Sequence, residues 1–120
     1  MTTGAKTTKE VLIEARALIE NETDWGRGKL EDKPNGRLCA VGAILTAKHG
    51  SRYLQMGTLE EPDWDLEKAF LRPLAEVLPY AEVTNLESGE SVVHHITAFN
   101  DTMPHHCIIA AFDAAIEATS

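Results

Sequence analysis

Eight consecutive apolar or small residues, from Leu38 to Leu45, are the feature of this chain that most constrains its fold. The turn sequence Asn35-Gly36 comes just before the run. A helix that is apolar on all sides has to be buried, and the run is far shorter than the roughly 20 residues that cross a membrane. It therefore predicts a buried helix over about residues 38–49, against which the rest of the chain packs.

Four other segments carry apolar residues at the spacing of a helix that is buried on one side. Their expected bounds are about 8–21, 64–78, 91–100 and 104–117. Thr7 and Glu10 fit a capping box, while Asp63 and Asp101 are expected to cap the third and fifth helices. Pro73 has no backbone N–H to donate, so the third helix should kink or split just before it.

Together these patterns predict an all-α protein, a compact orthogonal bundle of about five helices in a single domain over residues 1–120. Two long loops, at about 23–37 and 50–63, separate the first three helices. Turn residues in the first loop indicate a small hairpin near residues 25–38. A weak strand signal lies at 81–83, and residues 1–6 are expected to be flexible.

The chain is acidic, with 19 Asp and Glu against 11 Lys and Arg and a net charge of −8. Direct binding of nucleic acid needs a basic surface that releases counterions, so this class of function is excluded. A protein partner, in particular a basic one, is compatible with the charge, and so is a homodimer. The N-terminus has no apolar signal-peptide segment, which predicts a cytoplasmic protein that does not bind membranes and keeps its two cysteines reduced.

Cys39, at the start of the buried run, is a candidate nucleophile. A thiol at a helix N-terminus feels the positive end of the helix dipole, which lowers its pKa. His94 or His95 would act as the base, and Asn100 or Asp101 would orient the imidazole, in the chain order of papain-like hydrolases. The alternative is a small buried core residue, because free Cys is among the most buried residue types. No Gly-rich oxyanion loop flanks Cys39, which favours this alternative.

Histidines and a cysteine gather where the fourth and fifth helices are expected to meet. His94, His105 and Cys107 are the weak metal-ligand candidates among them, because imidazole and thiolate both bind zinc. Their spacing matches no zinc-finger or HExxH pattern. A solvated helix junction explains the cluster better, and no cofactor is expected.

Trp25 and Asn100 have expected structural roles. Trp25 is the large apolar residue of the first loop and should pin that loop to the core. Asn100 follows Val93 and Ile96 at helical spacing, so its amide should face inward. A buried amide needs partners, and loop carbonyls and N–H groups are the nearest candidates.

Several short motifs together resemble a known family. They are Asp24-Trp25-Gly26, the segment Gly36–Ala43, the segment Ile96–Asp101, and a terminal helix that ends with the segment Phe112–Glu117. With the amphipathic first helix, this order resembles a family of small uncharacterised helical proteins from actinobacteria and their phages, a domain of unknown function. The likeness spans about residues 8–118 and is weakest over about 50–90. It implies a bacterial or phage cytoplasmic accessory protein and says nothing about catalytic residues.

The sequence therefore favours a non-enzymatic accessory protein that acts through protein–protein interaction. Two alternatives stay open. One is a cysteine-dependent hydrolase or transferase that uses Cys39 with His94 or His95. The other is a metal-binding regulatory domain at the corner formed by His94, His105 and Cys107.

Overall fold

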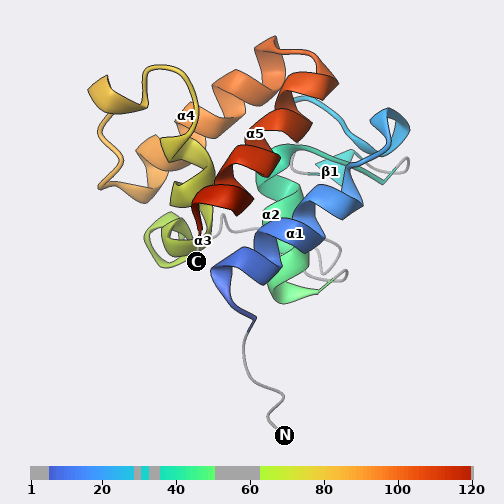
Figure 1. Ribbon diagram of the computed structural model, residues 1–120, viewed down its shortest axis with the longest axis horizontal. Helices are drawn as coiled ribbons and strands as arrows, with labels where there is room; N and C mark the ends of the chain where they lie inside the picture. Colours follow the sequence, from blue (N-terminus) through green and yellow to red (C-terminus); the bar gives the residue numbers. More distant parts are fainter. Residues whose placement is uncertain (1–5, 29–30, 33–35, 51–62, 120) are drawn as a thin grey trace, which may run out of the picture.

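The computed structural model describes residues 6–28, 31–32, 36–50 and 63–119 of the chain (Figure 1). Most of these residues lie in five α-helices: α1 (Thr8–Leu18), α2 (Ala40–His49), α3 (Trp64–Glu76), α4 (Gly89–Thr102) and α5 (His105–Ala118). The predicted all-α bundle of about five helices is confirmed. Residues 1–5 of the N-terminal segment that was predicted to be flexible lie outside the described residues. So do residues 51–62 of the second predicted loop.

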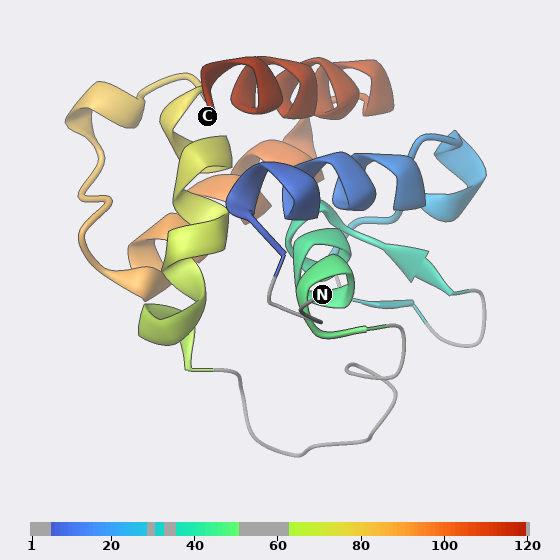
Figure 2. The same cartoon turned by 60° about the horizontal axis from the view of Figure 1, so that its bottom comes forward.

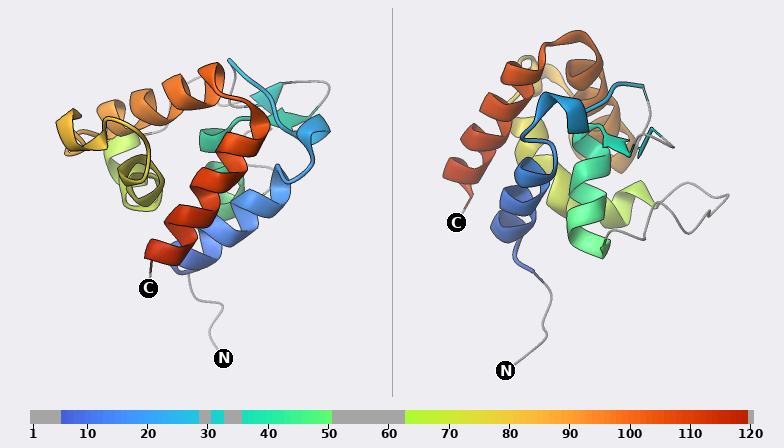
Figure 3. Two further views of the ribbon diagram at one scale, coloured as in Figure 1. Left: turned by 45° about the horizontal axis from the view of Figure 1, so that its top comes forward. Right: turned by 90° about the vertical axis from the view of Figure 1, so that its right-hand side faces the viewer.

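Most of the apolar run lies in α2, and the whole run from Leu38 to Leu45 is buried, as predicted. Val41, Ala43, Ile44 and Leu45 have no exposed surface. α2 packs against α1, α3 and α4, and α3 and α4 pack on each other. α1 and α5 lie side by side (Figures 2 and 3). No helix in the described ranges is long and apolar enough to cross a membrane.

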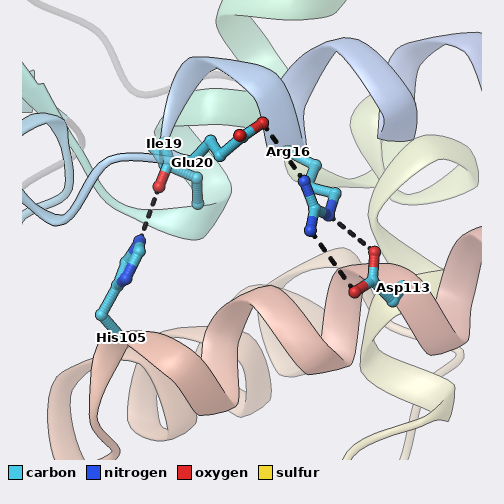
Figure 4. A network of polar contacts seen from close by, with 5 residues as sticks. All are labelled: Arg16, Ile19, Glu20, His105 and Asp113. Carbon is cyan, nitrogen blue, oxygen red and sulfur yellow. Dashed lines mark hydrogen bonds and ion pairs between the residues drawn. The ribbon is translucent and has the colours of Figure 1, made fainter.

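Polar contacts join the C-terminal end of α1 to α5 at two places (Figure 4). Arg16 Nε donates to Asp113 Oδ1 at 2.6 Å, and Arg16 Nη1 lies 3.3 Å from Glu20 Oε1. At the start of α5, His105 Nε2 donates to the carbonyl of Ile19 at 2.7 Å. These contacts fix the first and last helices against each other.

The helix starts confirm two predicted caps and correct a third boundary. The Thr7 side chain accepts from Glu10 N while the Glu10 carboxylate accepts from Thr7 N, which is the capping box of α1. Asp63 Oδ1 accepts from Asp65 N and caps α3. α2 begins later than predicted, with Cys39 at its N-cap position rather than in its first turn.

A small hairpin lies between α1 and α2, where the turn residues predict one. Strand β1 (Glu31–Asp32) pairs antiparallel with strand β2 (Arg37–Leu38). A 3₁₀ helix, η1 (Glu22–Asp24), leads into Trp25, which forms a bridge to β2. The hairpin therefore brings the first loop back to the start of α2.

Two local predictions between α3 and α4 need correction. Of the kink or split predicted at Pro73, the split is absent, because one helix runs from Trp64 to Glu76. Leu71, Leu74 and Ala75 beside it are buried, and their packing outweighs the one backbone hydrogen bond that proline cannot donate. The segment Ala81–Val83 forms a 3₁₀ helix, η3, rather than a strand. Its N–H groups bond to carbonyls three residues back, so it needs no partner strand.

The corner between α4 and α5 also differs from the prediction. Asp101 lies in the last turn of α4 rather than capping α5, and Pro104 occupies the N-cap position of α5 without a side-chain cap. The Asp101 carboxylate has other partners, since Oδ1 accepts from Gly28 N and from Asn100 Nδ2. A long-range role has therefore replaced the expected local one.

Candidate functional site

Cys39 is sealed in the core at the N-terminus of α2, with 3% of its surface exposed. Its Sγ accepts a hydrogen bond from Gly42 N at 3.3 Å, a role that Ser or Asp usually fills at an N-cap. Burial raises the pKa of the Cys39 thiol above its usual value, although backbone hydrogen bonds act in the opposite direction. The thiol is therefore protonated at neutral pH, whereas the helix dipole alone would favour the thiolate.

The two candidate bases lie on α4 and are placed differently. His94 is exposed, and His95 is half-buried. The Nε2 atom of His95 is buried and has no hydrogen-bond partner among the described residues. No hydrogen bond in the described ranges joins either imidazole to Cys39. The cysteine-dependent enzyme therefore stays a prediction.

Asn100 is the centre of a buried polar cluster that joins three parts of the chain. Its Oδ1 accepts from Trp25 Nε1 at 2.7 Å and from Ala40 N at 3.0 Å. Its Nδ2 donates to the carbonyl of Gly26 at 3.1 Å and to Asp101 Oδ1 at 3.0 Å. With 1% of its surface exposed, the side chain makes every hydrogen bond that an amide can make. We call these five residues the Asn100 cluster, and the predicted inward orientation of Asn100 is confirmed.

Trp25 is buried and held by aromatic and cationic neighbours, which confirms that it pins the first loop to the core. The Arg27 guanidinium lies 4.9 Å from the centre of its ring, and the His105 ring lies 5.4 Å from it. Arg27 Nη2 also donates to the carbonyl of Met103 at 2.6 Å. The loop is therefore tied to the corner between α4 and α5 through side chains and backbone.

The metal-ligand candidates at this corner have separate environments. His105 already uses Nε2 to bond the carbonyl of Ile19. His94 is exposed and Cys107 is half-buried. In the part of the chain that the structure describes, no group of three or more His, Cys, Asp or Glu side chains is placed to hold a metal ion. A metal site here also stays a prediction.

Sequence reasoning missed a buried ionic cluster between α2 and α3. The Glu67 carboxylate is buried, and its Oε1 lies 3.0 Å from both Lys48 Nζ and His49 Nε2. Lys48 Nζ also lies 4.5 Å from the centre of the Phe70 ring. A buried Glu is rare unless it is paired. One signal could have revealed it, because Glu67 precedes the buried Leu71 by one helical turn.

An exposed apolar surface around η3 was also missed. Tyr80 and Val83 are 72% and 77% exposed. Beside Tyr80 lies a mostly apolar pocket of about 300 Å³, lined by Pro79, Tyr80, His95, Ala98, Phe99, Thr102 and Met103. We call this pocket the apolar pocket, and the pocket together with Tyr80 and Val83 the η3 surface. No signal in the sequence predicts it, because this segment has neither helical nor strand periodicity over a useful length.

Tyr80 has a backbone conformation that few residues other than glycine adopt. Its φ of 68° and ψ of 11° lie in the left-handed region. Among the described residues, Tyr80 is the one residue other than glycine with positive φ. This conformation costs about 1–2 kcal/mol for a residue with a Cβ atom. The turn is held by the Tyr80 carbonyl, which accepts from Val83 N and from Thr84 Oγ1.

A second pocket, of about 510 Å³, adjoins η3 on its α3 side. Its walls include the carboxylates of Glu76, Glu82 and Glu87 and the guanidinium of Arg72. Arg72 Nε lies 3.0 Å from Glu76 Oε2, and Arg72 Nη2 lies 3.2 Å from Glu87 Oε2. Three carboxylates around one guanidinium leave a negative excess, so we call this the acidic pocket.

The candidate residues thus fall into two groups by what they can do. Cys39, Trp25, Asn100 and His105 make internal hydrogen bonds that hold the fold. The η3 surface and the acidic pocket face solvent and are open to a partner.

Comparison with known proteins places the chain in a family without assigning an activity. No curated protein and no solved structure matches it. One family model matches residues 3–118, nearly the whole chain, and its description is a family of unknown function. The resemblance to an uncharacterised family that the motifs indicate is thereby supported. The chain belongs to the family of unknown function DUF6197.

Proposed function

We propose that this protein is a non-enzymatic accessory protein that binds another protein through the η3 surface. Tyr80 is the observation that carries the proposal. Its ring is mostly in water, and its backbone has a conformation that glycine adopts at no steric cost. A large aromatic side chain at such a position contributes little to the core. Aromatic side chains are enriched where proteins bind each other, which supports a role for Tyr80 in binding.

The surroundings of Tyr80 support binding. Val83, one turn of η3 further on, exposes a second apolar side chain. The apolar pocket beside Tyr80 offers a place for one side chain of the partner. Binding energy at protein interfaces concentrates where an anchoring side chain fills such a pocket. The η3 surface combines an exposed aromatic residue with a pocket of this kind.

The residues that first pointed to an enzyme also favour binding over catalysis. The Cys39 thiol is buried and protonated, and the amide of Asn100 is fully used by internal hydrogen bonds. A nucleophile needs a thiolate and an access path, and the burial and raised pKa of the Cys39 thiol work against both. A bacterial or phage setting is part of the proposal and rests on the sequence motifs alone.

In-cell photo-crosslinking tests the proposal. A photoreactive amino acid replaces Val83 on the η3 surface, and a control protein carries it in place of Glu22 in η1, on the opposite side of the molecule (Figure 1). We expect irradiation to give a discrete protein adduct from position 83 and none from position 22. No adduct from either position, or the same adduct from both, would count against a binding role for the η3 surface.

A further inference from the structure

Two pockets of opposite character meet at η3. Tyr80 lines the apolar pocket, and the next two residues, Ala81 and Glu82, line the acidic pocket. A segment that crosses η3 therefore meets both pockets within a few residues. Whatever binds here has to satisfy an apolar site and a charged site together.

Among the residues that the structure describes, the negative charge at η3 is not fully paired. Arg72 pairs with Glu76 and Glu87, and Lys68 donates to the backbone carbonyl of Glu87 from the same side. Glu82 is exposed and has no ion-pair partner among the described residues. It lies between Tyr80 and Val83, so the unpaired carboxylate belongs to the same turn as the exposed apolar side chains.

From this arrangement we infer that the η3 surface binds a basic segment of another protein, in which an apolar anchor residue is flanked by Lys or Arg. The inference rests on the proposed binding function and adds the chemistry of the partner. The anchor enters the apolar pocket beside Tyr80. The Lys or Arg side chains pair with Glu82 and the carboxylates of the acidic pocket. Complementary charges of this kind speed association and select the partner.

A second copy of this chain does not fit as the occupant. Its net charge is −8, and its own η3 surface presents the same unpaired carboxylate. Bringing two such surfaces together would place like charges next to each other, which disfavours association. The acidic character of the whole chain also steers basic partners toward it.

Selection from a phage-displayed library of short random peptides on the immobilised full-length protein tests the inference. We expect enriched peptides that combine a large apolar residue with an excess of Lys and Arg. The Glu82→Lys variant should weaken the binding of these peptides by about tenfold or more. Glu22→Lys makes the same charge change in η1, far from η3, and should leave binding unchanged. Tyr80→Gly removes the ring while relieving the left-handed backbone, and an unchanged midpoint in urea denaturation assigns any loss of binding to the ring.

The outcomes distinguish failure of the inferred basic partner from failure of the proposed binding at the η3 surface. Two outcomes would overturn the inferred basic partner but leave the proposed binding surface standing. In the first, the enriched peptides need Tyr80 but carry no excess of Lys and Arg. In the second, they bind Glu82→Lys as well as wild type. Peptides that bind Tyr80→Gly as well as wild type would overturn both. Failure to enrich any peptide would also count against both.

Discussion

At the scale of single residues, Cys39 shows how burial reverses the chemistry that a helix N-terminus favours. Its raised pKa leaves less thiolate at any given pH, and its side chain is inaccessible. We expect iodoacetamide at neutral pH to modify the half-buried Cys107 first, and Cys39 only after denaturant is added. Mass spectrometry of the peptides measures both rates. Rapid modification of Cys39 in the folded protein would instead support the prediction of a cysteine-dependent enzyme.

The same thiol makes stability depend on pH in the alkaline range. Because its folded pKa lies above the usual value of 9.0, the unfolded thiol ionises first as the pH rises. The stability that the protonated Cys39 thiol contributes is fully present below about pH 9. It is lost as the pH rises toward the pKa of this thiol in the folded protein. We expect the free energy of unfolding of wild type, relative to Cys39→Ala, to be smaller at alkaline than at neutral pH. A constant difference in urea denaturation across this range would contradict the assignment.

His95 has a buried ring nitrogen that finds no hydrogen-bond partner among the residues that the structure describes, and this should cost stability. An unsatisfied buried polar atom costs about 1–3 kcal/mol. We therefore expect His95→Leu to match wild type or to be more stable by about 1 kcal/mol in urea denaturation, since it removes that atom. The control is His94→Leu, which changes an exposed neighbour on the same helix and should gain nothing. A marked loss of stability in His95→Leu would show that the imidazole has a partner in solution.

At the scale of elements, the start of α4 depends on the absence of one side chain. A Cβ atom at Gly89 would lie 2.2 Å from the backbone C and O atoms of Trp64, and Gly89 N donates to Asp65 Oδ1 at 2.8 Å. Backbone cannot move aside as a flexible side chain can. We expect Gly89→Ala to lower the free energy of unfolding by about 2–4 kcal/mol. Glu90→Ala, at the exposed next position, should change it by less than about 0.5 kcal/mol. Equal effects in urea denaturation would refute the close packing of α4 on α3.

Helices and caps could be predicted where local sequence signals agreed with burial. Predictions were wrong where partners distant in the sequence competed with the local ones. The capping box at Thr7 and the cap at Asp63 need only nearby N–H groups, so sequence sufficed. Asp101 also looks like a cap, but the backbone N–H of Gly28 reaches its carboxylate from far along the chain. Pro73 predicts a kink or split, yet α3 does not split there, because burial of its neighbours holds the helix together.

At the scale of the whole molecule, the site residues could be predicted by type but not by partner. Helical spacing predicts that Asn100 faces inward, whereas its bonds to Trp25 and Ala40 span 75 and 60 residues. The η3 surface is defined by what the fold leaves uncovered at Tyr80 and Val83. Exposure of that kind follows from the packing of α3 and α4, which no local pattern encodes.

The Asn100 amide couples the first loop, the start of α2 and the end of α4, so its loss should be felt across the molecule. Asn100→Ala leaves the indole N–H of Trp25, the N–H of Ala40 and the carbonyl of Gly26 buried without their partner. Each such group costs about 1–3 kcal/mol, although relaxation and water recover part of the sum. We expect a loss of about 2–4 kcal/mol in urea denaturation, a large share of the 5–15 kcal/mol that stabilises a typical domain.

Tryptophan emission reports the same change from inside the cluster, because Trp25 should gain access to water in Asn100→Ala while Trp64 does not. The matched control is Asn85→Ala, which removes an exposed amide whose Oδ1 accepts from the nearby Glu87 N. It should cost less than about 1 kcal/mol and leave the emission unchanged. If the two variants lose the same stability, the Asn100 cluster is a local contact. If Asn100→Ala alone unfolds early and shifts the emission to the red, one amide holds three distant segments of this fold together.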